Sequence, residues 1–441
     1  MRTWRTTLVI LSALLALPVM TYAWLDWESA RAVRKEFGRL RAAGEPLTLA
    51  AITPPPVPDA ENAALLYLRA FPHLREIDRL KNGYWDARRA TATDRQWSLD
   101  RLRPLVEANR YALELATRGS QLTASRLPIN WEKYDPVNGG TGALAHDCRD
   151  LAITFAAQAW LQNADGEAVA AMNSCLAGLR VSRQLMQEPD IIAWMSSEVM
   201  QAILLTEMSR VLEEHQVPPD ICAAAFKQVT GADPGKSLRH TLQAHRVQGL
   251  VNLEYFSARP RELWQQYDQY DAMPRWALAL RISPLGGLLG RNERLWWLQT
   301  MGRLLELSER PYREVAGETQ RVDAEEEQLP SYYAAARLLT VPTILIRSRD
   351  RLQTRYNATA ILLALETYRG RCGKYPDSVA ALCDYPGWKL PEDPFSGKGF
   401  AYRRRGKGFV LYSYGDDLDD DGGRPAAHRG SDGDLVWEFQ K

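Results

Sequence analysis

The sequence predicts a mainly α-helical protein with three parts: an N-terminal membrane helix, a helical body, and a C-terminal α+β domain made of a long helix and a small antiparallel sheet. Three observations predict this fold class. An apolar run begins a few residues after the N-terminus. Apolar residues then recur at spacings of three and four from about residue 98 to 316, as amphipathic helices require. Beyond residue 376 the composition changes to glycine, proline, aspartate and aromatic residues, with short alternating stretches.

The composition places the chain among folded globular proteins. Of its 441 residues, 46% are hydrophobic and 25% are charged. This length predicts two or three domains. The formal net charge is +1, so no overall field attracts a polyanion, and we expect no nucleic-acid partner.

Residues 1–24 are predicted to be a signal-anchor or a signal peptide. Arg2 and Arg5 precede an apolar run over residues 7–24, and acidic residues follow it. Because basic residues stay on the cytoplasmic side, this charge order places the bulk of the chain outside the cytoplasm. The run is near the lower length limit for crossing a bilayer. It either remains as an anchor in the cytoplasmic membrane or is cleaved after Ala23; a buried core helix is the third alternative.

The segment 25–58 is predicted to join the N-terminal helix to the body. A short amphipathic helix is expected over about residues 29–43. The following residues, 53–58, contain four prolines. Proline fixes φ and lacks an N–H group, so this stretch cannot be helical and is predicted to be a stiff, extended spacer.

Residues 59–321 are predicted to form a helical body, either a helical bundle or an irregular solenoid. The connections between its helices are short, which favours antiparallel neighbours. The predicted helices cover residues 60–71, 100–119, 142–162, 165–187, 190–215, 220–229, 238–256 and 291–309.

Two of these helices, on either side of the turn Asp165-Gly166, are rich in alanine. Ala156, Ala157 and Ala159 precede the turn, and Ala168, Ala170, Ala171 and Ala177 follow it. Small residues at a helix crossing let two backbones approach closely. The segment weakly resembles a tetratricopeptide-type helical hairpin. No second copy occurs at the period of about 34 residues, so we expect no repeat array.

The acidic stretch 322–330 is predicted to be a linker to a C-terminal domain, residues 331–441. A long helix is expected over about residues 342–371. Three short strands are predicted at 399–403, 408–412 and 435–439.

The C-terminal domain carries a particular order of short motifs. The long helix ends near Tyr375-Pro376, the turn Leu390-Pro391-Glu392-Asp393-Pro394-Phe395 follows, and the strand at 408–412 leads into an acidic Asp-Gly loop. This order resembles the C-terminal domain of the major pseudopilins of type II secretion. The resemblance implies an exported, non-catalytic domain in which a small antiparallel sheet packs on the long helix.

Two features depart from the pseudopilin family. No prepilin-peptidase motif directly precedes the apolar run at 7–24. The long helix lies far from that run and carries Arg347, Arg349 and Asp350, so it cannot span a membrane. We therefore expect a pseudopilin-like domain on a different body, and not a pilus subunit.

The acidic loop before the last strand is the candidate metal site. Clustered carboxylates on a glycine-rich turn supply the hard oxygen ligands that calcium prefers, and the pseudopilin resemblance also implies calcium in this region. An EF-hand is excluded because His428 stands at the twelfth position counted from Asp417. The alternative is a solvated acidic turn without a metal. The candidate ligands are Asp416, Asp417, Asp419, Asp421, Asp432 and Asp434.

The five cysteines predict up to two disulfides in an exported protein. Cys372 and Cys383 lie on either side of a turn, and Cys148 and Cys175 lie on consecutive predicted helices. Cys222 is left over. The alternative is that all five are unpaired core thiols.

Together these observations predict a membrane-anchored, extracytoplasmic binding or scaffold protein. Its expected partners are the cytoplasmic membrane and envelope or secretion proteins, and calcium is the only expected cofactor. One alternative is an envelope hydrolase, in which His146, Glu132, Tyr134 and Asp135 would have to converge within hydrogen-bond reach. The second alternative is an atypical pseudopilin.

Overall fold

The computed structural model describes residues 2–136, 139–268, 275–384, 389–427 and 432–440; only the backbone is described for 2–15, 266–268, 275, 278 and 383–384. The molecule is mainly helical, with a three-stranded antiparallel sheet near the C-terminus. The prediction of a mainly α protein with a small C-terminal sheet is confirmed at this level.

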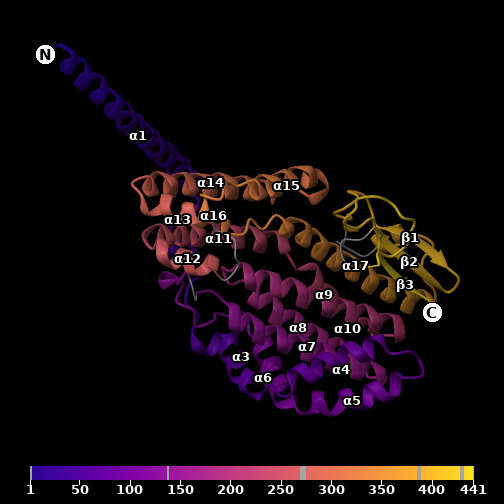
Figure 1. The fold of residues 1–441 in the computed structure, drawn as a ribbon. Coiled ribbons are helices and arrows are strands. Elements are labelled where there is room, and N and C mark those ends of the chain that lie inside the picture. Colours follow the sequence, from indigo (N-terminus) through magenta and orange to yellow (C-terminus); the bar gives the residue numbers. More distant parts are fainter. Residues whose placement is uncertain (1, 137–138, 269–274, 385–388, 428–431, 441) are drawn as a thin grey trace.

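Helix α1 (Arg2–Ala42) is one continuous helix, and its N-terminal part projects away from the body (Figure 1). The apolar run and the amphipathic helix that follows it were predicted as separate elements. They are joined because the residues between them contain no proline or glycine, and the single Pro18 lies inside the helix. In its C-terminal part α1 buries Val33 and Leu40 and packs along α14 (Gly286–Leu307).

Among the described residues, no helix is both long enough and apolar enough to cross a membrane. The side chains of residues 2–15 lie outside the described part of the chain, and they include half of the predicted anchor at 7–24.

The proline-rich spacer follows the short helix α2 (Leu49–Ile52) and leads into α3 (Ala63–Ala70). Asn62 begins α3 because its side-chain oxygen accepts a hydrogen bond from the Ala64 N–H at 3.1 Å. The helix predicted over 60–71 is therefore shorter, and Asn62 sets its start.

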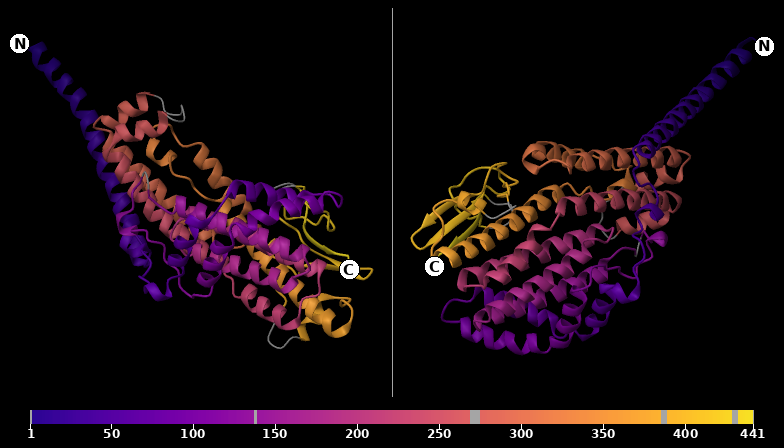
Figure 2. Two further views of the ribbon diagram at one scale, coloured as in Figure 1. Left: turned by 90° about the horizontal axis from the view of Figure 1, so that it is seen from below. Right: turned by 180° about the vertical axis from the view of Figure 1, so that it is seen from behind.

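Helices α7 (Gly142–Ala164), α8 (Ala168–Leu185) and α9 (Ile191–Glu214) form the centre of the body. They lie side by side in Figures 1 and 2. Their small residues permit this close packing: a Cβ on Gly178 would lie 2.8 Å from Leu204 Cδ2 and 3.1 Å from Phe155 Cβ. Asp190 caps α9 by accepting a hydrogen bond from the Ile192 N–H at 2.7 Å.

Helices α3 to α6 cover one side of α7 and α8. The helix predicted over 100–119 is broken between α5 (Arg95–Glu107) and α6 (Arg110–Ser120). The break depends on Asn109, which is fully buried and bonds to both the N–H and the carbonyl of Arg75. Helix α4 covers Ile77–Arg89.

The remaining helices pack on the other side of α9. Helices α11 and α14 approach closely where the Trp297 ring covers Gly249, and Trp297 Nε1 donates to the Arg246 carbonyl at 2.9 Å. Residues 322–327, expected to lie in a linker, are instead the end of α15. The bounds are α10 Pro219–Thr230, α11 Pro234–Ala258, α12 Pro260–Asp268, α13 Arg275–Ile282, α15 Tyr312–Glu327, α16 Ala334–Arg337 and α17 Ile344–Cys372.

The long helix α17 belongs to the body and to the C-terminal sheet at the same time. It packs against α9, α10 and α11, and its C-terminal part also carries the sheet (Figure 1). One hydrophobic core runs without interruption from Leu40 to Phe439. The C-terminal segment therefore shares this core with the body.

The sheet has the order β1-β2-β3, with β1 (Ala401–Arg405), β2 (Gly408–Ser413) and β3 (Leu435–Phe439) all antiparallel. The central strand β2 is almost entirely buried. The Phe409 ring packs against Tyr375 and Phe439, with ring centroids 4.7 Å and 4.8 Å apart. This aromatic cluster attaches the sheet to the end of α17.

Candidate metal centre

The acidic loop connects β2 to β3, and buried hydrogen bonds hold its first residues. Asp393, in the turn that precedes β1, is 1% exposed and accepts a hydrogen bond from Ser413 Oγ at 2.6 Å. It also accepts one from the Tyr414 N–H at 3.4 Å. The loop therefore starts at a fixed point on the sheet.

The two arms of the loop are joined by backbone hydrogen bonds. The Asp434 N–H donates to the Arg424 carbonyl at 2.8 Å, and the Ala426 N–H donates to the Asp434 carbonyl at 3.2 Å. Gly422 and Gly423 take φ values of +68° and +86°, which glycine adopts without steric cost. These features bring the start and the end of the loop together.

Four of the predicted carboxylates meet at this point. One carboxylate oxygen from each of Asp417, Asp419, Asp421 and Asp432 lies within 4.8 Å of the others. The Gly433 N–H donates to Asp417 Oδ2 at 2.6 Å and so fixes one of them. Asp419 and Asp432 are exposed, which makes the cluster accessible from solvent.

The structure places the other two candidates, Asp416 and Asp434, outside this group of four. Asp416 forms an ion pair with Arg351 of α17, whose Nε donates to Asp416 Oδ1 at 3.0 Å. Asp434 is 1% exposed and accepts a hydrogen bond from the Gly423 N–H at 2.7 Å. Burial raises the pKa of Asp434 to about 6. Both residues position the loop.

The electrostatics of the cluster are dominated by negative charge. Loss of hydration, together with Asp417, Asp421 and Asp432, raises the pKa of Asp419. Arg424 offsets part of this repulsion: its guanidinium contacts Asp421 and lies 2.7 Å from Asp432 Oδ2. Hydrogen bonds to these two carboxylates raise the Arg424 pKa.

This donor set fits a hard divalent cation. Calcium takes six to eight oxygen ligands, and four carboxylates that can each bind through one or two oxygens supply most of them. The residues that would hold it are Asp417, Asp419, Asp421 and Asp432. A bound cation would compete with Arg424 for two of these carboxylates.

Two residues of the hydrolase alternative, His146 and Tyr134, contact residues outside the predicted set. His146 lies 2.7 Å from Arg149 Nη2 and 3.5 Å from an Asp150 oxygen. Tyr134 is bonded to Asn252. Glu132 is exposed, and no hydrogen bond or ion pair between His146 and either of these residues occurs in the described part of the chain.

Cys148, Cys175 and Cys222 are buried and Cys372 is exposed, and no disulfide joins any two of these four cysteines. The predicted Cys148–Cys175 disulfide is therefore not formed in this structure. Burial raises the pKa of both thiols, because each sulfur lies in the apolar centre of α7 and α8. The side chain of Cys383, the predicted partner of Cys372, lies outside the described residues.

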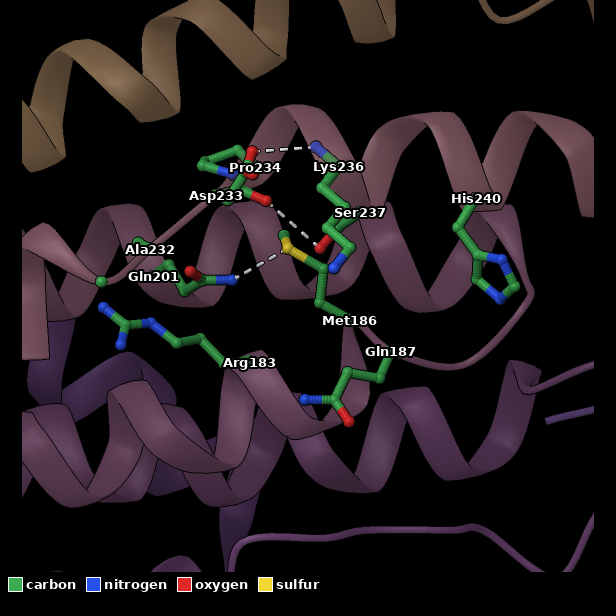
Figure 3. Close-up of a pocket in the computed structure, with 11 residues that line it drawn as sticks. Arg183, Met186, Gln187, Gln201, Ala232, Asp233, Pro234, Lys236, Ser237 and His240 are labelled. Atoms are coloured by element: carbon green, nitrogen blue, oxygen red, sulfur yellow. Dashed lines mark hydrogen bonds between the residues drawn. The ribbon is translucent and has the colours of Figure 1, made fainter. Parts of the chain in front are cut away.

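Sequence reasoning missed a cavity of about 390 Å³ beside the N-terminus of α11 (Figure 3). Gln201, 1% exposed, lines it; its amide donates to Met186 Sδ at 3.5 Å, and its carbonyl accepts from Tyr356 Oη. Asp233 caps α11 by accepting a hydrogen bond from the Lys236 N–H at 2.9 Å. The lining residues come from the end of α8 and the turn after it, from α9, from the α10–α11 turn and from the first turns of α11, so no local motif identifies the cavity.

Comparison with known proteins gave no relative. No family model matches the chain, and no curated protein or solved structure matches it.

Proposed function

We propose that the chain is a membrane-anchored, extracytoplasmic binding or scaffold protein with a pseudopilin-like, calcium-binding segment at its C-terminus. The observation that carries this proposal is the exposed apolar surface of the projecting helix α1. Leu17, Val19 and Met20 are 62–65% exposed. Surface of this kind is costly in water and favourable in a bilayer.

The junction between α1 and the body supports a fixed mounting. Asp26 of α1 forms an ion pair with Arg291 of α14. Three residues further along α1, Ser29 Oγ donates to Asn292 Oδ1 at 2.8 Å. Because these contacts fix the angle between α1 and the body, the orientation of α1 in a membrane would set the orientation of the whole molecule.

The acidic loop lies at the other end of the body from this junction. Figures 1 and 2 both show the sheet far from the place where α1 leaves the body. We assign partner binding to this distal end, where Asp419 and Asp432 face solvent. Calcium would neutralise the carboxylates there and order the surface that a partner contacts.

Membrane association tests the first half of the proposal. The double variant Leu17→Arg/Val19→Arg is expected to move the full chain from the membrane to the soluble fraction, because a charged side chain in hydrocarbon costs about 2.5–3.5 kcal/mol. The matched control is Trp97→Arg, an exposed apolar residue of α5 on the body. Retention of the double variant in the membrane would contradict the anchor.

The side of the membrane is measured with Cys372, the exposed free thiol. A membrane-impermeant maleimide added outside the cytoplasm is expected to label Cys372 in cells with a permeable outer layer. A Cys372→Ser variant gives the background. Labelling only after the cytoplasmic membrane is broken would place the body in the cytoplasm and contradict the proposed extracytoplasmic location.

Calcium binding and partner capture test the second half. The double variant Asp419→Asn/Asp432→Asn is expected to lose calcium binding measured by titration calorimetry, and to lose calcium-dependent co-purification of envelope proteins. Asp78→Asn, at a fully solvated site in α4, is the control. Arg424→Gln is expected to bind calcium about tenfold more tightly, because it removes a competing positive charge. Unchanged affinity in both loop variants would contradict the site.

A further inference from the structure

A second exposed apolar surface lies on the body, at the corner between α13 and α14. We call it the α13–α14 corner and define it by Trp276, Ile282 and Leu285, which are 51%, 63% and 40% exposed. The corner turns at residues 283–285, where the Leu285 N–H donates to Ser283 Oγ at 3.1 Å. Three large apolar side chains exposed within one short segment of the chain indicate a contact surface.

The charged residue next to Ile282 is turned inward. Arg281, next to Ile282 in the chain, is 7% exposed and forms an ion pair with Glu293, which is fully buried. Glu293 Oε1 also accepts a hydrogen bond from the Ala335 N–H at 2.9 Å. A surface turn in water normally places its charges outside and its apolar residues inside. In the corner, Arg281 is buried, whereas Ile282 and Leu285 are exposed.

The corner is fixed beside α1. Tyr22 Oη donates to the Pro284 carbonyl at 2.8 Å, and the ion pair between Asp26 and Arg291 follows one helical turn later. Figure 1 shows α13 and the start of α14 at the place where α1 leaves the body. The position of the corner along α1 is therefore set by residues 22–26.

At the same level, α1 exposes two indole rings. Trp24 and Trp27 are 57% and 53% exposed. A helix rises 1.5 Å per residue, so Tyr22 and Trp27 are about 8 Å apart along the axis. Tryptophan collects at the headgroup level of a bilayer, where its ring is buried and its N–H stays hydrated. Both rings lie at the end of the apolar run at 7–24.

We propose that the α13–α14 corner is a second membrane contact, which inserts Trp276, Ile282 and Leu285 into the interfacial layer of the bilayer that α1 enters. The proposal rests on the proposed anchor function of α1. The occupant is lipid because the corner is held beside the exposed apolar part of α1 by Tyr22, at the level of Trp24 and Trp27. With contacts through α1 and through the corner, the body has a defined tilt on the membrane, and the acidic loop points away from it.

The test uses the full chain with Cys372→Ser, reconstituted into phosphatidylcholine–phosphatidylglycerol vesicles. A fluorescent label is placed by Leu285→Cys, and the matched control label by Val169→Cys. Val169 is an exposed apolar residue in the first turn of α8. It lies near Asp165, which forms an ion pair with Arg103 of α5. Helix α5 is on the opposite side of the body from α1 (Figure 1). Lipids carrying a nitroxide at a shallow or a deep acyl position act as quenchers.

The label at position 285 is expected to be quenched several-fold more by the shallow nitroxide lipid than the label at 169. In a second variant, the label is placed by Trp276→Cys and the corner is changed by Ile282→Asp/Leu285→Asp. Quenching of this label is expected to be severalfold lower than quenching of the same label without the two Asp substitutions, while the chain still floats with the vesicles. Equal quenching at 285 and 169 in floating protein would overturn the corner proposal alone, as would undiminished quenching in the Asp variant. A chain that does not float would overturn the anchor and the corner together.

Discussion

At the scale of single residues, the aspartates of the acidic loop have different roles although their side chains are identical. Asp417, Asp419, Asp421 and Asp432 share one cluster, whereas Asp434 is buried below it. Nothing in the local sequence separates these roles, because each aspartate lies in the same acidic, glycine-rich composition. Burial and hydrogen bonding decide them.

Asp434 predicts a pH dependence of stability. Burial raises its pKa to about 6 in the folded protein, above the value of about 3.9 in an unfolded chain. The folded state therefore binds the proton more tightly, and this group favours folding at low pH and loses that contribution as the pH rises through about 6. Asp434→Asn is expected to remove this part of the pH dependence.

The measurement is the urea midpoint of wild type and Asp434→Asn between about pH 4 and 7, in metal-free buffer. The difference in unfolding free energy between the two proteins should change in favour of the variant as the pH rises. If the unfolding free energies of the two proteins changed in parallel with pH across this range, Asp434 would not have the raised pKa described.

The ion pair between Arg351 and Asp416 connects the loop to α17. The Arg351 and Asp416 side chains are 8% and 6% exposed, so removal of Arg351 leaves the buried Asp416 carboxylate with only Arg347, whose Nε lies 3.7 Å away. Arg351→Met is expected to lower the unfolding free energy by up to about 3–5 kcal/mol. Arg303→Met, which breaks an exposed pair with Glu325, should cost less than about 1 kcal/mol. Chemical denaturation compares the two, and similar losses would contradict this role.

At the scale of elements, close helix packing depends on small residues at particular positions. The Cβ of an alanine at Gly178 would lie 2.8 Å from Leu204 Cδ2, inside van der Waals contact. Gly178→Ala is therefore expected to destabilise the protein by about 1–3 kcal/mol, although alanine has the higher helix propensity.

Gly317 in α15 provides the matched control, because a Cβ there meets no atom within 4 Å. Gly317→Ala is expected to stabilise the protein by up to about 1 kcal/mol through helix propensity alone. Thermal unfolding of both variants gives the comparison. Stabilisation by Gly178→Ala would mean that α8 and α9 are not packed this closely.

Element boundaries differ from the predicted ones where a distant residue intervenes. The break between α5 and α6 depends on the bonds of Asn109 to Arg75, which lie far apart in sequence. Helix α9, in contrast, begins where it was predicted, because its cap is the local residue Asp190. Local caps can be read from sequence, and long-range hydrogen bonds cannot.

At the scale of the whole molecule, the single continuous core has a direct consequence for truncation. Deletion of residues 331–441 removes α17 from its contacts with α9, α10 and α11. The truncated chain is expected to lose cooperative thermal unfolding, because large apolar faces become exposed. Circular dichroism and binding of a hydrophobic dye measure this. Deletion of residues 1–27, which removes the projecting part of α1, should leave the transition cooperative.

A cooperative transition in the chain ending at residue 330 would show that the body folds alone, as the predicted linker at 322–330 implies. Because removal of the C-terminal segment is expected to disturb folding, it cannot be used to test partner binding. Substitutions in the acidic loop are the suitable test, since they change the binding site while the core stays intact.

The sequence by itself determined the helical class, most helices of the body, the small antiparallel sheet and the acidic loop as a place of clustered carboxylates. These depend on hydrophobic periodicity, prolines and local composition, which act over a few residues. The continuity of α1 also follows from local sequence, because no proline or glycine lies between residues 24 and 29. Only the tertiary structure decided that α17 lies in the core of the body, and that Asp416 pairs with Arg351 while Asp434 is buried. Those outcomes depend on contacts between segments far apart in the chain, where burial sets the strength of each charge and hydrogen bond.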